Sequence, residues 1–319
     1  MGKKQITMRD IAKACGVSVA TVSYVLSHSE KEKISHDTRL RVMETATRLK
    51  YCPRPPVQGS FRRSGYAAIV VNLKPVNHPG KKLLFSDLAS ELGRQLQARG
   101  FQPLLFHSKS LERDAAAIAS QKPDAVFMID VDNARIREST KAFYAPIIFM
   151  DCELRDPFFC KVLPDYEEVL TKARATLACD APFLVLEDIL SSELLSLLIR
   201  DFAIEDVFIR TPEADVASFL HGKAGRKGIV LGDLLAAEAA HSFPPGDLVA
   251  LSSLGDSGLL PPEMRTLYVS NRNKAAVAVE LMEDLLALGH YSEGDNRLLL
   301  ECEDTVQAAH GSMLPSGIQ

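Results

Sequence analysis

Short runs of apolar residues alternate with amphipathic segments from residue 66 to residue 303. Runs of Val, Ile, Leu and Phe without polar alternation are typical of strands that helices bury on both faces. We therefore expect parallel strands joined by crossover helices. The expected strands are 67–73, 101–107, 124–130, 146–151, 183–187, 206–211, 228–232, 248–254, 265–270 and 297–303, and the expected helices are 83–99, 111–121, 134–143, 165–178, 192–202, 213–220, 234–242 and 274–288.

These βα units are too numerous for one flavodoxin-sized sheet. We predict a body at residues 66–319 with two lobes of about 100 residues each, both built on doubly wound parallel sheets. Lobe 1 is expected at about 66–164 and lobe 2 at about 165–264, and segments of 265–303 should cross back to complete part of lobe 1. A single eight-fold barrel is the competing fold, because βα repeats also form it.

Residues 7–26 show two short helical patterns that Gly16 separates. Thr7 is a predicted N-cap, and Asp10 three residues later completes a capping-box pattern. Gly16 adopts positive φ at little cost, which suits a turn between two helices that cross steeply. The residues that we expect to face inward on the first helix are Ile11, Ala12 and Ala14.

The second helix is expected to begin after Ser18, a predicted N-cap. Its inward residues should be those spaced as one helix face, namely Val22, Val25 and Leu26. A third helix at about 35–50 follows from apolar residues at three- and four-residue spacing, namely Leu40, Met43, Ala46 and Leu49. Together these patterns predict an all-α helix-turn-helix headpiece at residues 1–53.

The charge distribution divides the chain at about residue 63. Residues 1–63 contain 13 Lys and Arg against 5 Asp and Glu, a net charge of +8. The remaining residues contain 24 basic and 36 acidic side chains, a net charge of −12, although the whole chain carries only −4. A small basic segment attached to an acidic body indicates a nucleic-acid-binding end.

The outward side of the second helix is the predicted DNA contact. The start of such a helix approaches base edges, which makes Val19, Ala20 and, one turn later, Tyr24 the expected base contacts. Hydroxyl groups and basic side chains are expected to hold phosphates; these are Thr7, Ser18, Thr21, Ser23, Ser27, Lys31, Lys33, Arg39 and Arg41. The alternatives are a small helical bundle with solvated Ser and Thr faces and, for the four basic residues, a solvated charge run.

Residues 7–53 resemble the headpiece of the LacI/GalR (lactose-repressor) family of bacterial transcription regulators. They follow the pattern D-I-A-x-x-x-G-V-S-x-x-T-V-S-x-V-L and end in LKYCP at 49–53. The resemblance implies a DNA-binding repressor with a two-lobed, periplasmic-binding-protein-like body. It places the operator-reading positions at Val19, Ala20 and Tyr24. Many members carry Arg where this chain has Tyr24, so we expect a different operator sequence.

Residues 54–65 form a Pro-rich basic linker. In the resembled family this segment becomes a hinge helix on DNA and inserts a Leu into the minor groove, a wedge mechanism that other proteins share. The aligned position here is Ser60, and the nearest apolar residue is Phe61. Pro55 and Pro56 fit only at a helix start. Either Phe61 is the wedge after a shift of one residue, or the linker stays extended and acts as a tether.

Ligands of doubly wound sheets bind at the carboxyl ends of the strands. Polar residues there are candidate ligand contacts, with helix capping as the alternative role; the ones we single out are Asn72, Asp130, Asp151, Glu187 and Asp256, beside Asp188, Asp233 and Asn271. In sugar-responsive family members an Arg stands where this chain has Cys152, and another where it has Cys302. The family also carries two acids where this chain reads SLGD at 253–256, so the first of them is lost. Losing an Arg fork and an acid removes the bidentate hydrogen bonds that hold a polyol, so we expect a different effector or none.

Several other classes of protein are excluded by the sequence. The first 13 residues lack the apolar segment of a signal peptide, and no apolar run reaches the roughly 18–20 residues of a membrane span. The six cysteines form no CxxC pair, which suits reduced thiols in a cytoplasm. The Gly- and Lys-rich segment 222–228 precedes a strand, so we interpret it as a solvated connector rather than a phosphate loop.

We therefore predict a cytoplasmic bacterial repressor that binds a pseudo-palindromic operator in double-stranded DNA. One headpiece covers only a half-site, so we expect a homodimer or a tetramer of such dimers. A small molecule between the lobes is one expected mode of control. The alternatives are an effector-less regulator controlled by a protein partner and a small-molecule-binding or enzymatic body with a DNA tether. We expect no catalytic residue, cofactor, metal site or membrane partner.

Overall fold

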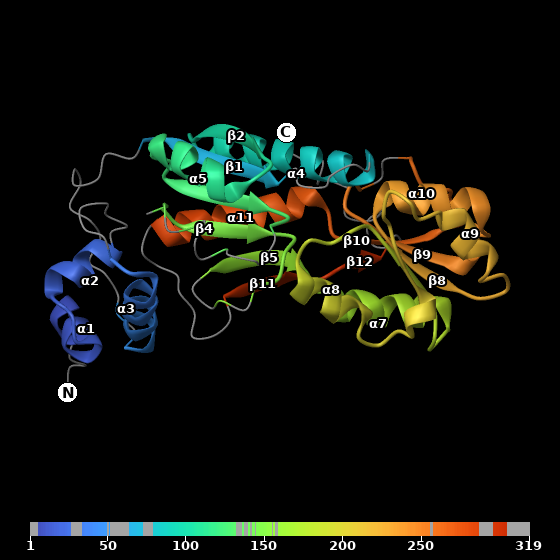
Figure 1. The fold of residues 1–319 in the computed structure, drawn as a ribbon, viewed down its shortest axis with the longest axis horizontal. Coiled ribbons are helices and arrows are strands. Elements are labelled where there is room, and N and C mark those ends of the chain that lie inside the picture. The colour runs from blue at the N-terminus through green and yellow to red at the C-terminus, as the bar shows by residue number, and fades with distance from the viewer. Residues whose placement is uncertain are drawn as a thin grey trace, which may run out of the picture. The chain divides into compact units, whose positions relative to one another are not determined.

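The computed structural model describes residues 6–26, 34–49, 51, 64–72, 79–131, 136, 140, 142–143, 145–154, 156, 159–255, 258–286 and 296–304. Its N-terminal part contains the three predicted helices, α1 (Met8–Cys15), α2 (Val19–Leu26) and α3 (His36–Arg48). They enclose a small apolar core of their own, formed by Ile11, Ala12, Cys15, Val22, Val25, Leu26, Val42, Met43 and Ala46. Figure 1 shows these helices in blue at the N-terminal end of the chain.

The inward face of α1 differs from the predicted one. Ile11 and Ala12 are buried, as expected, but Ala14 is exposed and Cys15 is buried in its place. Cys15 lies one helical turn after Ile11, and its thiol donates to the backbone oxygen of Arg41 at 3.5 Å. The prediction for Ala14 is wrong because a small apolar residue on a short helix says little about which side it faces.

The first sheet has the strand order β11-β5-β4-β3-β1-β2, and β1 to β5 pair in parallel. Its strands are β1 (Tyr66–Asn72), β2 (Gln102–Ser108), β3 (Ala125–Ile129), β4 (Ile147–Met150), β5 (Cys160–Pro164) and β11 (Arg297–Leu300). The helices α4 (Pro79–Ala98), α5 (Leu111–Ser120) and α11 (Asn271–Leu286) connect these and later strands. Strands β3 and β4 are buried throughout, as the continuous apolar runs predict.

The second sheet has the order β12-β10-β9-β8-β6-β7, in which β6 to β10 are parallel and β12 is antiparallel to β10. Its strands are β6 (Phe183–Leu186), β7 (Val207–Ile209), β8 (Gly228–Leu231), β9 (Leu248–Ser252), β10 (Arg265–Tyr268) and β12 (Glu303–Asp304). The helical segments between them are α7 (Tyr166–Leu177), α8 (Ser192–Ile199), η1 (Ile204–Asp206), α9 (Val216–His221), α10 (Asp233–Ser242) and η2 (Pro245–Asp247). Two open sheets replace the single barrel that was the competing fold.

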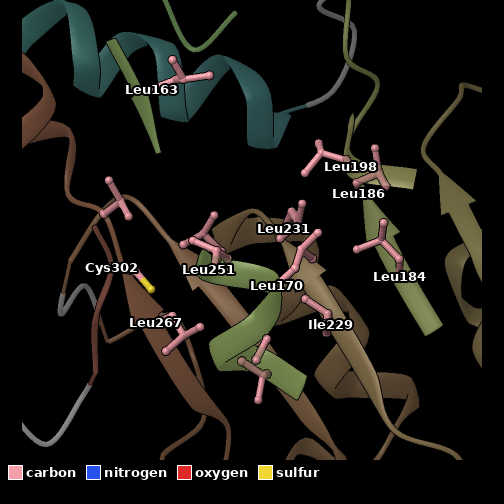
Figure 2. Close-up of a cluster of buried hydrophobic side chains, with 14 of the residues drawn as sticks. Leu163, Leu170, Leu184, Leu186, Leu198, Ile229, Leu231, Leu251, Leu267 and Cys302 are labelled. Atoms are coloured by element: carbon pink, nitrogen blue, oxygen red, sulfur yellow. The ribbon is translucent and has the colours of Figure 1, made fainter. Parts of the chain in front are cut away.

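Alternate residues of the second sheet enter two different apolar clusters. Leu184 and Leu186 of β6 join a cluster with residues of α7 and α8, part of which Figure 2 shows. Phe183 and Val185 of the same strand join a cluster with residues of α9 and α10. Because successive side chains of a strand point to opposite faces, helices cover both faces of this sheet. The sheet therefore has the two-sided burial that its apolar sequence predicts.

Strand β5 is absent from the predicted strands. Lys161 stands in the middle of its apolar run, yet this side chain is completely buried. Its Nζ donates to the backbone oxygens of Leu154 at 2.8 Å and Asp156 at 3.4 Å. A buried ammonium group is tolerated when such acceptors replace water. The strand was not predicted because its apolar run contains a charged residue. Carbonyl groups five and seven residues earlier in the chain accept the hydrogen bonds of that charge.

The C-terminal segments complete the first lobe only in part: residues 276–298 belong to the first unit and β11 lies in the first sheet, as predicted, but residues 265–275 do not return to it. Strand β10 pairs with β9, and β12 pairs with β10, so both lie in the second sheet. By compactness the chain divides into a first unit, residues 1–74, 92–162 and 276–298, and a second unit, residues 75–91, 163–275 and 299–319. Residues 265–275 thus belong to the second unit. Across the part of the chain described, no helix combines the length and the apolar character needed to cross a bilayer.

Candidate nucleic-acid interface

Thr7 and Asp10 fix the start of α1. The backbone N–H and the hydroxyl of Thr7 donate to Oδ2 of Asp10 at 2.8 and 2.7 Å, and the Asp10 N–H donates to Thr7 Oγ1 at 3.4 Å. This is the reciprocal arrangement of a capping box, as predicted. Because the Thr7 hydroxyl donates to a carboxylate, its role in this structure is to cap α1.

Gly16 ends α1 in the left-handed backbone region, with φ 66° and ψ 35°, and its N–H donates to the Ala12 oxygen. A Cβ at this position would meet no atom within 4 Å, so backbone conformation alone accounts for the glycine. Two residues later, Ser18 Oγ accepts from the Thr21 N–H at 2.9 Å. Both ends of the turn are therefore fixed by local hydrogen bonds, which set the position of α2 on α1.

The two sides of α2 differ in burial. Val22, Val25 and Leu26 lie in the headpiece core, as predicted. An α-helix advances by about 100° per residue, so Ala20 and Tyr24, one turn apart, lie opposite to this buried side. Val19 flanks them with 42% of its surface exposed, and Ala20 is exposed as well. Ala20 and Tyr24 thus belong to the side of α2 that faces away from the headpiece core, whereas Val19 points closer to the buried side and is exposed because it begins the helix.

The hydroxyl groups at the start of α2 are arranged as a pair. Ser18 Oγ and Thr21 Oγ1 lie 2.9 Å apart, and one of them donates to the other. The hydroxyl that accepts in this pair keeps its own hydrogen for another acceptor, such as a phosphate oxygen. Ser23 is half-buried on the same helix. Ser18 and Thr21 therefore combine a capping role with a donor group at the end of the helix that favours anions.

Basic side chains on α1 extend the candidate surface beyond the predicted set. Arg9 and Lys13 are both exposed and stand one helical turn apart. Sequence reasoning missed them, although their i, i+4 spacing was the available signal. Of the predicted basic residues, Arg41 is exposed and Arg39 is half-buried. Ser27, Lys31, Lys33 and Phe61 lie outside the described residues, as does most of the linker.

The candidate ligand residues of the first unit lie at one edge of its sheet. Asn72 is the last residue of β1, and Asp130 and Asp151 directly follow β3 and β4; the three strands are neighbours in the strand order. Asp130 and Asp151 both adopt positive φ, 51° and 52°, and Asp130 is buried. The prediction that strand ends bring these side chains to a common edge agrees with this placement. Asp256, the candidate from the second unit's later strands, lies outside the described residues.

The cysteines that replace the family's Arg residues are core groups. Cys152 is fully buried, and burial raises the pKa of its thiol far above the usual range, with further increases from nearby carboxylates. Cys302 is also buried, and burial raises its pKa to about 11. Its backbone N–H donates to Glu168 Oε2 at 2.9 Å. Both thiols therefore stay neutral and contribute to packing, and neither supplies the charge of the Arg that it replaces.

Glu187 is the candidate ligand residue that follows β6 in the second unit. Its carboxylate lies 3.9 Å from Nε of Arg210, whose guanidinium also pairs with Glu238. The side chains of Glu187 and Arg210 are only 14% and 12% exposed. Glu187 is therefore held in a network of charged groups within its own unit.

The Gly- and Lys-rich segment 222–228 connects α9 to β8 and is exposed at Gly222, Ala224 and Gly225, as the predicted solvated connector would be, and its basic side chains form ion pairs. Lys223 and Arg226 both pair with the carboxylate of Asp206. The Arg226 hydrogen bonds, followed by the Lys223 bond, lower the pKa of Asp206 to about 2. Lys227 Nζ donates to the Leu177 oxygen at 2.5 Å. The basic side chains of segment 222–228 thus attach it to Asp206 and to the end of α7.

Comparison with known proteins places the headpiece in a family. The family model described as "Bacterial regulatory proteins, lacI family" matches residues 7–54. The chain is 51% identical over 53 residues to the regulator GalS of Salmonella typhimurium, which covers 17% of this chain and 15% of GalS. It is 27% identical over 145 residues to the regulator GalR of Lacticaseibacillus casei, covering 46% of this chain and 42% of GalR.

A longer match is 28% identical over 192 residues to the fructose operon regulatory protein of Vibrio cholerae, covering 55% of each chain. The chain therefore matches about half the length of these curated relatives. Among solved structures it is similar to a CelR–cellobiose complex, with a TM-score of 0.58 and 18% identity over 94% of this chain and 98% of that one. It is also similar to the Lac repressor dimer bound to operator and the anti-inducer ONPF, with a TM-score of 0.57 and 14% identity over 94% of this chain and 98% of that one. These similarities establish the fold of the body.

Proposed function

We propose that the chain is a repressor of the LacI family, whose family model matches residues 7–54, and that it recognises a specific DNA operator. The observation that carries the proposal is α2. Its inner side is held in a dedicated core, its start is capped by Ser18, and Ala20 and Tyr24 face away from that core. This is what a helix needs in order to enter a major groove as a rigid body.

Base contacts and phosphate contacts are expected from different side chains of the headpiece. Val19 and Ala20 are small and apolar, so they suit close approach to thymine methyl groups, whereas Tyr24 adds a ring and a hydroxyl that reads base edges. Ser18, Thr21, Arg9 and the other basic and hydroxyl groups would hold phosphates and set the register. Specificity is therefore expected to rest on Tyr24 more than on any other described residue.

A homodimer is the assembly that fits this headpiece. One recognition helix covers a half-site, and two helices related by a two-fold axis read a pseudo-palindrome. We place dimer formation in the body, because the net positive charge, which binds DNA, is confined to the headpiece and linker. As a bacterial DNA regulator the protein would act in the cytoplasm. Light scattering of the full chain, with and without DNA, distinguishes a dimer from a tetramer by mass.

Selection of bound sequences from a random DNA pool tests the proposal directly. The full chain should enrich a pair of inverted half-sites, with centres separated by about one helical turn. A pool that stays unenriched after several rounds, compared with rounds without protein, would exclude sequence-specific recognition. The selected sequence then serves as the operator in the experiments below.

A matched pair of substitutions at Ala20 tests whether α2 is the helix that touches the DNA. Ala20 is exposed, so Ala20→Glu and Ala20→Gln should leave the core intact. Glu places a negative charge against the groove and should weaken binding by roughly a hundredfold or more, whereas Gln has nearly the same size and should cost far less. Equal affinities for the two variants would mean that another surface binds the DNA.

A further inference from the structure

The carboxyl ends of the parallel strands β6 to β10 meet at one edge of the second sheet. Ligands of doubly wound sheets bind at this kind of edge. The residues that follow these strands are Glu187, Arg210, Gly232, Ser253 and Asn271. The first turns of α4, which belong to the same unit, contact several of them.

Gly80, in the first turn of α4, packs against the end of β6. A Cβ on Gly80 would lie 2.6 Å from Glu187 Oε1 and 3.4 Å from Cβ of Leu234, which belongs to the helix that follows β8. No side chain fits at the first distance unless the carboxylate moves. The glycine therefore permits the helix to approach the strand ends closely, with Pro79 as a favourable residue at the helix start.

Asn271 binds α4 at the other end of this edge. It is completely buried, and its Nδ2 donates to the backbone oxygen of Leu84 at 3.0 Å and to Oδ2 of Asp87 at 2.9 Å. The Asn271 N–H in turn donates to the Ser253 oxygen at 2.8 Å, which ties the amide to the end of β9. A buried amide with two such acceptors specifies the position of the helix.

The part of α4 between its two contacts is somewhat shorter than the width of the edge. Residues 80–87 rise by about 10 Å along a helix. The strands from β6 to β10 span three spacings, about 14 Å in total. Lys81 and Phe85 of the same segment are both buried, and Lys81 Nζ lies 5.5 Å from the ring centre of Phe85. The segment thus contacts residues that follow β6, β8 and β10.

We propose that residues 79–87 are a built-in occupant of the ligand edge of the second unit, so that a separate small molecule does not bind there. Of the residues that sequence analysis offered as ligand contacts, Asn271 donates hydrogen bonds to this segment and Glu187 packs closely against Gly80. The regulatory meaning rests on the proposed function: a repressor built in this way binds its operator without a sugar effector at this edge.

Hydrogen exchange of the full chain tests the occupancy, with no need for DNA. The amides of residues 83–91 should be protected in the wild type, and Gly80→Ala should speed their exchange by roughly tenfold. Gly93→Ala is the matched control, because it lies on the same helix and its Cβ would meet Pro103 only at 3.8 Å. Gly93→Ala should leave exchange unchanged or slower, since Ala favours the helix.

Two further variants separate the steric contact from other effects. Combining Gly80→Ala with Glu187→Ala should restore protection, because the clashing carboxylate is removed. Asn271→Ala should speed exchange in residues 83–91 by itself. If Gly80→Ala and Gly93→Ala behave alike, or if Glu187→Ala gives no rescue, the proposed occupancy is wrong.

A ligand arm tests whether the edge is closed. We expect D-galactose, D-fructose, D-ribose and cellobiose, each at millimolar concentration, to change neither the exchange of residues 83–91 nor the affinity for the selected operator. Faster exchange of this segment with any of these sugars would overturn the proposal, because the sugar would then displace it. Failure of the DNA selection would remove the repressor function but would leave the exchange results intact.

Discussion

At the scale of single residues, the headpiece assigns different tasks to neighbouring side chains of α2. Thr21 lies in the first turn, where its N–H and hydroxyl bind Ser18, and where helix-start groups meet phosphates. Tyr24 lies one turn further along, on the side opposite to Val22 and Val25. The position of each side chain on α2, more than its chemical type, indicates whether it contacts the bases or the phosphate backbone of the DNA.

Substitution of these two residues should therefore give different results. Tyr24→Ala should relax base preference at one position of each half-site, with a cost of about 1–3 kcal/mol on the preferred base. Thr21→Ala should weaken binding to all sequences by a similar factor, and Thr21→Ser should retain binding because it keeps the hydroxyl. Binding of each variant to a library of single-base operator variants measures this. A uniform loss with Tyr24→Ala would contradict the assignment.

The Asp206 ion pairs predict a pH dependence in the second unit. The folded-state pKa of Asp206 is about 2, below its usual value of 3.8, so the ion pairs stabilise the fold at pH values above about 4. This contribution is lost as the pH falls through 4 towards 2. Asp206→Asn should destabilise the unit by about 1 kcal/mol at neutral pH.

The measurement is denaturant unfolding of both proteins over a range of pH. The difference between wild type and Asp206→Asn should shrink steadily below pH about 4. Glu193→Gln is a suitable control, because Glu193 is a carboxylate that accepts a hydrogen bond from the neighbouring Ser192 hydroxyl and forms no ion pair among the described residues. A difference that persists unchanged at pH about 2 would show that charge is not its cause.

At the scale of elements, the ends of helices decide where the candidate surfaces lie. Local hydrogen bonds end α1 at Gly16 and start α2 at Ser18. The start of α4 instead packs against Glu187 through Gly80, and these two residues are far apart in the sequence. The end of α1 and the start of α2 can be predicted from a few neighbouring residues. The packing at the start of α4 cannot, because its partner is distant in the sequence.

Replacement of Gly16 tests how strongly the turn positions α2. Gly16→Ala introduces no clash, so its cost is the left-handed backbone, about 1 kcal/mol or slightly more. It should speed hydrogen exchange in α1 and α2 and weaken operator binding. Gly246→Ala is the control, because its Cβ also meets no atom within 4 Å and its backbone is not left-handed. Equal effects of the two variants would show that the left-handed backbone of Gly16 does not determine the position of α2.

At the scale of the whole molecule, opposite charges separate a binding end from the body. A headpiece segment of +8 favours phosphates, whereas −12 on the remaining residues disfavours DNA binding elsewhere. The apolar cores follow the same division, because α1 to α3 have a core without any residue of the body. The headpiece is thus able to hold its shape on its own interactions.

Operator affinity should therefore fall steeply with salt. A dimer that contacts about six phosphates would lose roughly a thousandfold in affinity between 50 and 200 mM salt. Lys13→Ala should reduce the slope of log affinity against log salt by about one for each subunit, if Lys13 meets a phosphate. Lys122→Ala, an exposed lysine of the body, should leave the slope unchanged. A slope near zero for the wild type would contradict electrostatic binding of DNA.

The sequence by itself determined the headpiece and the strand plan of the body. Thr7, Gly16 and Ser18 act through hydrogen bonds or backbone angles within a few residues, so their roles are visible in the local pattern. Apolar runs likewise predict buried parallel strands, because burial on both faces demands continuous apolar side chains. The candidate interface on α2 was predictable for the same reason, since helical periodicity separates Val22 from Ala20.

Only the tertiary structure decided the features that depend on distant partners. Lys161 occupies a strand because the carbonyls of a preceding loop accept its hydrogen bonds. Strand β10 lies beside β9, and the start of α4 contacts residues at the strand ends where sequence reasoning placed a ligand. Each of these features depends on atoms of a segment that is distant in the sequence. No local pattern of residues indicates which segment will supply those atoms.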